Sequence, residues 1–161
     1  MTHVRRNVRI FVSAAAALFP LAAAVGPVEA VETCDTLPAT LVGSSFADVL
    51  QGTSAADVIV GLGGDDEIYG GGGNDHICGG SGDDTIDGEA GEDRIFGGAG
   101  KDNIRGGADL NKEHDELFGE SGDDVMNGGG GADTFDGGTG TDTCITDADD
   151  GPLATATKNC P

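Results

Sequence analysis

A nine-residue repeat runs through most of this chain and limits how it can fold more than any other feature. Residues 70–87 read GGGGNDHIC followed by GGSGDDTID, so each block opens with glycine, has Asp at its sixth place and Ile at its eighth. The same frame extends over eleven units between residues 43 and 145, provided that four extra residues are allowed before His114. Such regularity predicts a stack of equivalent turns rather than a conventional globular domain.

Two places of the repeat keep their character throughout. The sixth place is Asp in every unit: Asp48, Asp57, Asp66, Asp75, Asp84, Asp93, Asp102, Asp115, Asp124, Asp133 and Asp142. The eighth place is apolar in every unit: Leu50, Ile59, Ile68, Ile77, Ile86, Ile95, Ile104, Leu117, Met126, Phe135 and Cys144. The last three residues of a unit alternate as a very short strand does, so we expect the eighth side chain to point inward. Glycines at places one, two and four suit a tight turn, because glycine reaches positive φ without steric cost.

The chain is strongly acidic, with 29 acidic and 8 basic residues and a formal net charge of −21. This excludes nucleic acid and anionic membranes as expected partners, because both bind basic patches. Two interpretations of the negative charge remain, an acidic disordered segment and a set of carboxylates that bind cations. The regular spacing favours cations, since disorder needs no period and stacked carboxylates repel one another. Ca²⁺ fits best, because it accepts roughly six to eight carboxylate and carbonyl oxygens, whereas Mg²⁺ demands stricter octahedral geometry.

Residues 1–30 have the pattern of a secretory signal peptide. Three arginines precede the apolar stretch of residues 10–25, and a plausible cleavage site follows at Ala30. A membrane anchor is the alternative, but the stretch is short for a span of roughly 20 apolar residues, and Pro20 interrupts it. We therefore expect a secreted, extracellular protein with no membrane association after cleavage. Losing three arginines and Glu29 with the leader changes the net charge of −21 to −23.

Four cysteines follow the leader: Cys34, Cys78, Cys144 and Cys160. An even number in an exported chain indicates disulfides, with free thiols as the alternative, and the sequence does not choose among three connectivities. We favour Cys34–Cys78 and Cys144–Cys160, because each would tie a terminal segment to the repeats and restrict the unfolded chain. Stability needs such support, since a chain with no Trp and one Tyr supplies little core.

The repeat resembles the hemolysin-type (RTX) calcium-binding nonapeptide, written G-G-x-G-x-D-x-U-x with U a large aliphatic residue. The resemblance covers residues 43–145 and implies an all-β fold, a right-handed parallel β-roll (a β-solenoid) of nonapeptide repeats. Two repeats would make one turn, with Ca²⁺ between stacked turns on each side. We expect residues 31–42 to form an N-terminal cap segment and residues 146–161 a C-terminal cap tail.

The resemblance also implies which residues hold calcium, with each ion shared by the aspartates of one unit and the next but one. The implied carboxylate ligands are Asp57, Asp66, Asp75, Asp84, Asp93, Asp102, Asp115, Asp124, Asp133 and Asp142. Carbonyls of turn glycines would complete the shells: Gly61, Gly63, Gly70, Gly72, Gly79, Gly97, Gly128 and Gly137.

Three departures from the family pattern matter. The first two units lack glycine at places two and four, so we expect their turns at Asp48 and Asp57 to differ and to cap the stack. The insertion in residues 106–118 replaces the fourth-place glycine, and we expect it to bulge from the edge beside Asp115. An N-terminal leader argues against a toxin's secretion module, because many family members leave the cell through a C-terminal signal.

A few other residues invite a functional interpretation. His76 and Cys78 can share a strand face as a zinc pair does, but a structural zinc site needs four N or S ligands, which favours an exposed histidine beside a disulfide. Arg94, Lys101 and Arg105 cluster on two neighbouring units, where we expect them only to soften local repulsion.

We predict a secreted calcium-binding protein that folds on binding several Ca²⁺ ions. It is not expected to be an enzyme, because its aspartates recur at a structural period and no unit stands out as a cleft. One alternative is a calcium-stiffened adhesin or matrix component that binds an extracellular protein or glycan, with residues 108–114 as a first place to mutate. Another is an accessory subunit of a separate secreted enzyme.

Overall fold

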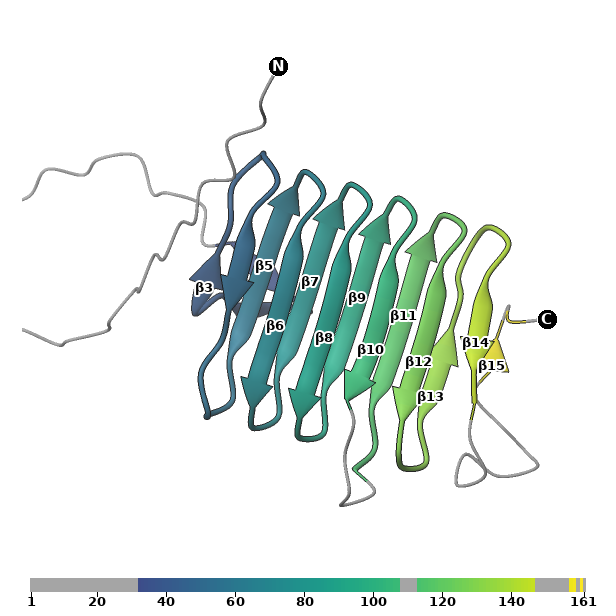
Figure 1. Ribbon diagram of the computed structural model, residues 1–161. Helices are drawn as coiled ribbons and strands as arrows, with labels where there is room; N and C mark the ends of the chain where they lie inside the picture. Colours follow the sequence, from purple (N-terminus) through teal and green to yellow (C-terminus); the bar gives the residue numbers. More distant parts are fainter. Residues whose placement is uncertain (1–31, 108–112, 147–156, 159, 161) are drawn as a thin grey trace, which may run out of the picture.

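The computed structural model describes residues 32–107, 113–146, 157–158 and 160, and its described elements are all β-strands. The strands stack as rungs of a flattened coil of about six turns (Figure 1). This confirms the expected all-β, parallel roll. The predicted signal peptide, residues 1–30, lies outside the described residues. Within the described ranges, no helix has the length and apolar character needed to cross a membrane.

The coil is built from two parallel sheets whose strands alternate along the chain. The seven-stranded sheet runs in the order β15-β13-β11-β9-β7-β5-β3 and the six-stranded sheet in the order β14-β12-β10-β8-β6-β4. The strands of the first sheet are β3 (Leu41–Val42), β5 (Val58–Gly63), β7 (His76–Ser81), β9 (Arg94–Ala99), β11 (Glu116–Ser121), β13 (Thr134–Asp136) and β15 (Thr157–Lys158). Those of the second are β4 (Val49–Gln51), β6 (Glu67–Gly72), β8 (Thr85–Ala90), β10 (Asn103–Gly107), β12 (Val125–Gly129) and β14 (Thr143–Ile145).

Register follows the repeat, with each residue paired to its equivalent two units further on. Ile59 pairs with Ile77, and Ile77 pairs with Ile95. Two nonapeptides therefore make one turn, as expected. The interior holds the eighth-place column, in which the first ten residues, Leu50 to Phe135, are at most 2 % exposed. Cys144, the eleventh, is partly buried against them.

The strands are longer than the sequence pattern indicated. The long ones cover six residues, from the seventh place of one unit to the third place of the next, so the turn occupies places four to six. Glycine at place two keeps the chain in the ladder with positive φ, as at Gly80, where φ is 113° and a Cβ would meet the Leu62 carbonyl of the previous turn. Leu62, Glu89 and Glu120 occupy the same place with φ of 79°, 70° and 70°.

The insertion does not disturb the ladder. β11 pairs with β9 in register, and Leu117 lies opposite Ile95. Elsewhere the fourth-place amide donates to a third-place carbonyl of the next turn, as Gly73 does to Ala90 over 2.9 Å. The Gly91 amide donates to Oε2 of Glu113 over 2.9 Å. The insertion thus contributes a side-chain carboxylate that accepts from a fourth-place amide.

Both ends of the coil carry the expected disulfides. Cys34, in the antiparallel hairpin of β1 (Thr33–Cys34) and β2 (Leu37–Pro38), bonds to Cys78 on β7. Cys144 on β14 bonds to Cys160. The pairing predicted from the sequence is confirmed, and each bond joins a terminal segment to the stacked turns.

Candidate calcium-binding edges of the roll

The sixth-place aspartates form two columns, one along each edge of the roll, because each stands just before a strand and the strands alternate between sheets. Aspartates that precede the six-stranded sheet are Asp48, Asp66, Asp84, Asp102, Asp124 and Asp142. Those that precede the seven-stranded sheet are Asp57, Asp75, Asp93, Asp115 and Asp133. All except Asp57 are buried, at 5 % exposure or less. The stacking expected from the spacing is therefore present, and it places like charges in two buried rows.

Neighbouring aspartates of a column are linked through one carboxylate oxygen. The backbone amide of Asp75 donates to Oδ1 of Asp93 over 2.8 Å, and that of Asp84 donates to Oδ1 of Asp102 over 2.9 Å. Asp115 keeps this pattern despite the insertion, since it accepts from the Asp93 amide over 2.8 Å. One oxygen of each carboxylate is thus fixed by the backbone one turn away.

The second carboxylate oxygen, Oδ2, is left without a hydrogen bond in most of the described turns. Buried Oδ2 atoms with no hydrogen-bond partner belong to Asp66, Asp75, Asp84, Asp102, Asp124 and Asp142. A buried polar atom of this kind is costly unless something satisfies it, and a bound ion is one way to satisfy it. Cation binding would supply the missing interaction.

First-place glycines complete a cradle around these oxygens. A Cβ built on Gly70 would lie 2.5 Å from Oδ2 of Asp75 and 2.5 Å from the carbonyl oxygen of Gly88, one turn on. The same pair of oxygens, a carboxylate and a first-place carbonyl, faces Gly61 and Gly79. Each cradle therefore brings together a carboxylate and a carbonyl oxygen, which is the mixture that Ca²⁺ accepts.

The electrostatics of the columns oppose ionisation without a cation. The pKa of Asp66 and of Asp84 is raised to about 6, chiefly by burial and to a smaller extent by the neighbouring aspartates, against the opposing effect of a backbone hydrogen bond. Burial likewise raises the pKa of Asp75 to about 6 and that of Asp102 to about 7. A divalent cation between turns would reverse this penalty, because opposite charge favours the ionised carboxyl.

In the first two turns, the Oδ2 atom of the aspartate has hydrogen-bond partners. Oδ2 of Asp48 accepts from the Ser44 amide over 2.6 Å and from its hydroxyl over 2.7 Å. Oδ2 of Asp57 accepts from the Thr53 amide and hydroxyl, both over 2.7 Å. A hydroxyl residue at place two thus occupies the oxygen that remains open in later turns, which agrees with the expectation that these turns differ.

Some residues implied as ligands lie apart from the cradles. A Cβ on the third-place Gly63 would face the hydroxyl of Ser81, and one on Gly72 would meet nothing nearer than 3.7 Å. Conversely, the cradles bring in Gly88, a first-place glycine that the sequence analysis did not select. Its signal was available, since glycine occupies the first place of every unit.

Side chains alone do not form a metal centre in the part of the chain that the structure describes. No group of three or more His, Cys, Asp or Glu side chains there is arranged to hold an ion. The zinc interpretation has no support, because Cys78 is engaged in a disulfide with Cys34. Any site at the edges must draw on carbonyls as well as carboxylates, and the cradles fit that requirement.

Comparison with known protein families agrees with this geometry. A family model for the RTX calcium-binding nonapeptide repeat matches residues 42–77, 79–113 and 111–144. The chain belongs to this family. A search of curated proteins returned no match. The RTX repeats and the stacked β-roll together make this a calcium-binding repeat protein.

Proposed function

We propose that this RTX protein is secreted and that it binds several Ca²⁺ ions in the edge cradles, with binding and folding as one coupled process. The observation that carries the proposal is the row of buried Oδ2 atoms without hydrogen bonds, each facing a first-place glycine. A site that exists only in the folded chain converts binding free energy into folding free energy. Below its calcium threshold the acidic chain would be expanded by its own charge.

The ligands of each ion would come from consecutive turns of one edge. On the six-stranded side, Asp66 and Asp84 would share an ion with carbonyls of the first-place glycines Gly61 and Gly79. On the other side, Asp75 and Asp93 would do the same with the carbonyls of Gly70 and Gly88. Bound Ca²⁺ would supply the positive charge that lets these carboxylates remain ionised while buried. Asp57 would contribute least, because Thr53 already satisfies its Oδ2.

Secretion fits this coupling. A chain that crosses a membrane from a low-calcium cytoplasm stays unfolded and then folds where calcium is abundant. Dissociation constants of about 10⁻⁴–10⁻³ M are typical of extracellular calcium modules. Two disulfides are consistent with an oxidising compartment.

Isothermal titration of the purified chain, first stripped with chelator, tests the proposal. We expect several Ca²⁺ ions to bind cooperatively and Mg²⁺ to bind far more weakly at the same concentration. Equal binding of the two ions, or no heat on adding Ca²⁺ at millimolar concentration, would contradict calcium binding at the cradles.

A further inference from the structure

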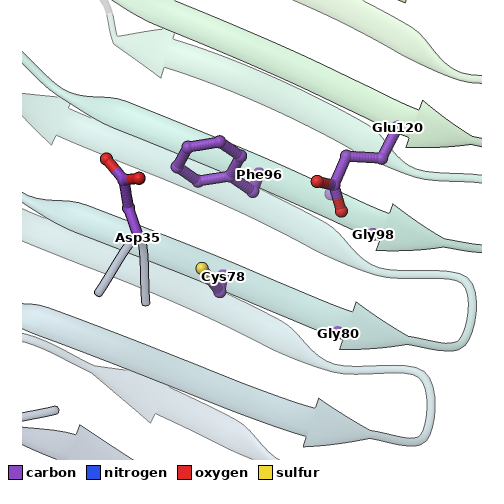
Figure 2. Close-up of a pocket in the computed structure, with 7 residues that line it drawn as sticks. Asp35, Cys78, Gly80, Phe96, Gly98 and Glu120 are labelled. Carbon is purple, nitrogen blue, oxygen red and sulfur yellow. The ribbon is translucent and has the colours of Figure 1, made fainter. Parts of the chain in front are cut away.

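A hollow of about 260 Å³ lies on the outer face of the seven-stranded sheet, away from the aspartate columns. Figure 2 shows the residues that surround it, which come from the N-terminal hairpin, β7, β9 and β11. They include Asp35, Cys78, Gly80, Phe96, Gly98 and Glu120.

The hollow exists because two neighbouring strands lack side chains at place two. β7 has Gly80 there and β9 has Gly98, whereas β5 carries Leu62 and β11 carries Glu120. The two glycines are register partners, so their bare backbones lie side by side and form the floor. Leu62 and Glu120 stand at the two sides of this gap along the roll.

One wall of the hollow is the aromatic ring of Phe96. Phe96 stacks on Phe118 of the next turn, with ring centroids 4.8 Å apart and planes 11° apart. The Arg94 guanidinium lies over both rings, 5.4 Å from the Phe96 centroid and 5.1 Å from the Phe118 centroid. Cys78 on β7 is the register partner of Phe96 on the side away from Phe118.

The charged groups at the hollow are acidic. Asp35 pairs with Nε of Arg94 at 3.1 Å. Glu120 is exposed and holds its carboxylate at the hollow from a place where the repeat normally has glycine. Its φ of 70° is unfavourable for a residue with a side chain. A carboxylate is therefore kept at the hollow at a conformational cost.

We propose that this hollow binds one arginine side chain of a basic peptide segment in another protein. The guanidinium would pack against Phe96 and the Cys34–Cys78 disulfide, which line the hollow, and donate paired hydrogen bonds to the Glu120 carboxylate. Arg94 makes the same combination within the chain, since it contacts two rings and pairs with Asp35 and Glu116. The net charge of −21 also attracts cationic partners. A neutral sugar fits less well, because it brings no positive charge to pair with the Glu120 carboxylate.

The test is NMR titration of the full, calcium-saturated chain with N-acetyl-arginine amide and with the peptide Gly-Arg-Gly at 0.15 M salt. We expect saturable shifts confined to the amides of Gly80, Gly98 and Glu120. The neutral analogue N-acetyl-citrulline amide should bind at least about fivefold more weakly, which follows from loss of the ion pair. The corresponding lysine compound should also bind more weakly, because its ammonium cannot make the paired hydrogen bonds of a guanidinium with a carboxylate.

Variants separate the site from general charge attraction. Phe96→Ala and Glu120→Gln should each weaken arginine binding at least about fivefold. The matched control is Glu89→Gln, since Glu89 has the same repeat place, the same φ of 70° and an exposed side chain, but lies on β8 in the other sheet. Glu120→Gly should abolish binding while raising the melting temperature, because it restores the glycine that the backbone favours, and this excludes misfolding as the cause.

Three results would overturn the proposal. The first is an equal loss of arginine binding in Glu89→Gln and Glu120→Gln, which would show non-specific attraction. The second is an absence of saturable shifts in the calcium-loaded protein. The third is binding of a methyl glycoside with the same shifts as arginine, which would identify a glycan site instead.

Discussion

The backbone amide of Asp66 donates a 2.8 Å hydrogen bond to Oδ1 of Asp84, its equivalent one turn further along the roll. This bond fixes the spacing of two buried carboxylates and leaves Oδ2 of each without a hydrogen bond. The backbone thus assembles a row of like charges that it does not neutralise. Calcium binding is proposed because these buried negative charges have no neutralising partner in the backbone.

Asp84→Asn should weaken calcium binding at least about tenfold at the sites it lines, since even residues behind metal ligands cost that much. The substitution removes charge while keeping an oxygen for the Asp66 amide. The matched control is Asp83→Asn, which makes the same charge change at an exposed residue of the same turn. Titration calorimetry of both variants measures the difference. Equal losses in the two variants would mean that total charge, rather than the buried column, governs affinity.

Gly79→Ala should impair calcium binding although Gly79 has no positive φ to explain the effect. Its Cβ would enter the cradle between Oδ2 of Asp84 and the carbonyl oxygen of Gly97. Gly72→Ala is the control, because a Cβ there meets nothing nearer than 3.7 Å and its φ is not positive. Calcium titrations that show no difference between these two alanines would argue against the first-place cradle.

Acid should have opposite effects on the metal-free and the calcium-bound roll. The pKa of buried Asp84 is about 6 and that of Asp102 about 7, both above the ordinary value of 3.8. The metal-free fold therefore binds protons more tightly than the unfolded chain. The stability that the protonated carboxyls contribute to this fold is complete below about pH 4 and is lost as the pH rises through 6 to 7. Calcium needs the ionised carboxylates, so its affinity should fall as the pH drops through the same range.

Thermal melts in chelator and calcium titrations, both run between pH 4.5 and pH 8, check this prediction. Metal-free melting temperatures that rise with pH across 6 to 7 would contradict it, as would calcium affinities that do not change over that range.

Ile86→Ala should destabilise the calcium-bound roll by about 2–5 kcal/mol, the usual cost of removing a large buried aliphatic side chain. Ile86 is fully buried in the single apolar column of the interior. Thr85→Ala, at an exposed position of the same strand, should change the stability by less than about 0.5 kcal/mol. Urea unfolding at saturating calcium measures both changes. Similar costs at the two positions would show that the column is not the main hydrophobic core.

The sequence was enough to predict the structural features that all units share, but not those of positions that depart from the repeat. The periods of Asp and of the eighth-place residues were enough to predict stacked equivalent turns with an inward apolar column and rows of aspartates, because every unit obeys the same geometry. The roll and its two repeats per turn were implied by the family resemblance. The turn position was misjudged, since glycines such as Gly80 remain in the ladder at positive φ. The hydrogen bond from the Gly91 amide to Glu113 needed coordinates, because it depends on where the insertion rejoins the stack.

The side-chain contacts on the outer face of the seven-stranded sheet could not be predicted from the sequence either. Arg94 was expected only to soften repulsion, yet it lies beside two aromatic rings and pairs with Asp35 and Glu116. These contacts join residues of two turns and of the hairpin, and no single unit contains them. Lys101 fits the simpler expectation, with one exposed ion pair to Asp123 at 2.9 Å.

Far-UV circular dichroism of the chain at pH 7.5, first in excess chelator and then through a calcium titration, tests the coupling of calcium to folding most directly. The account predicts little β-structure in chelator and a cooperative gain of it as calcium is added. A full β-spectrum in chelator that calcium does not change would contradict the account, because the buried aspartates would then tolerate one another without a cation.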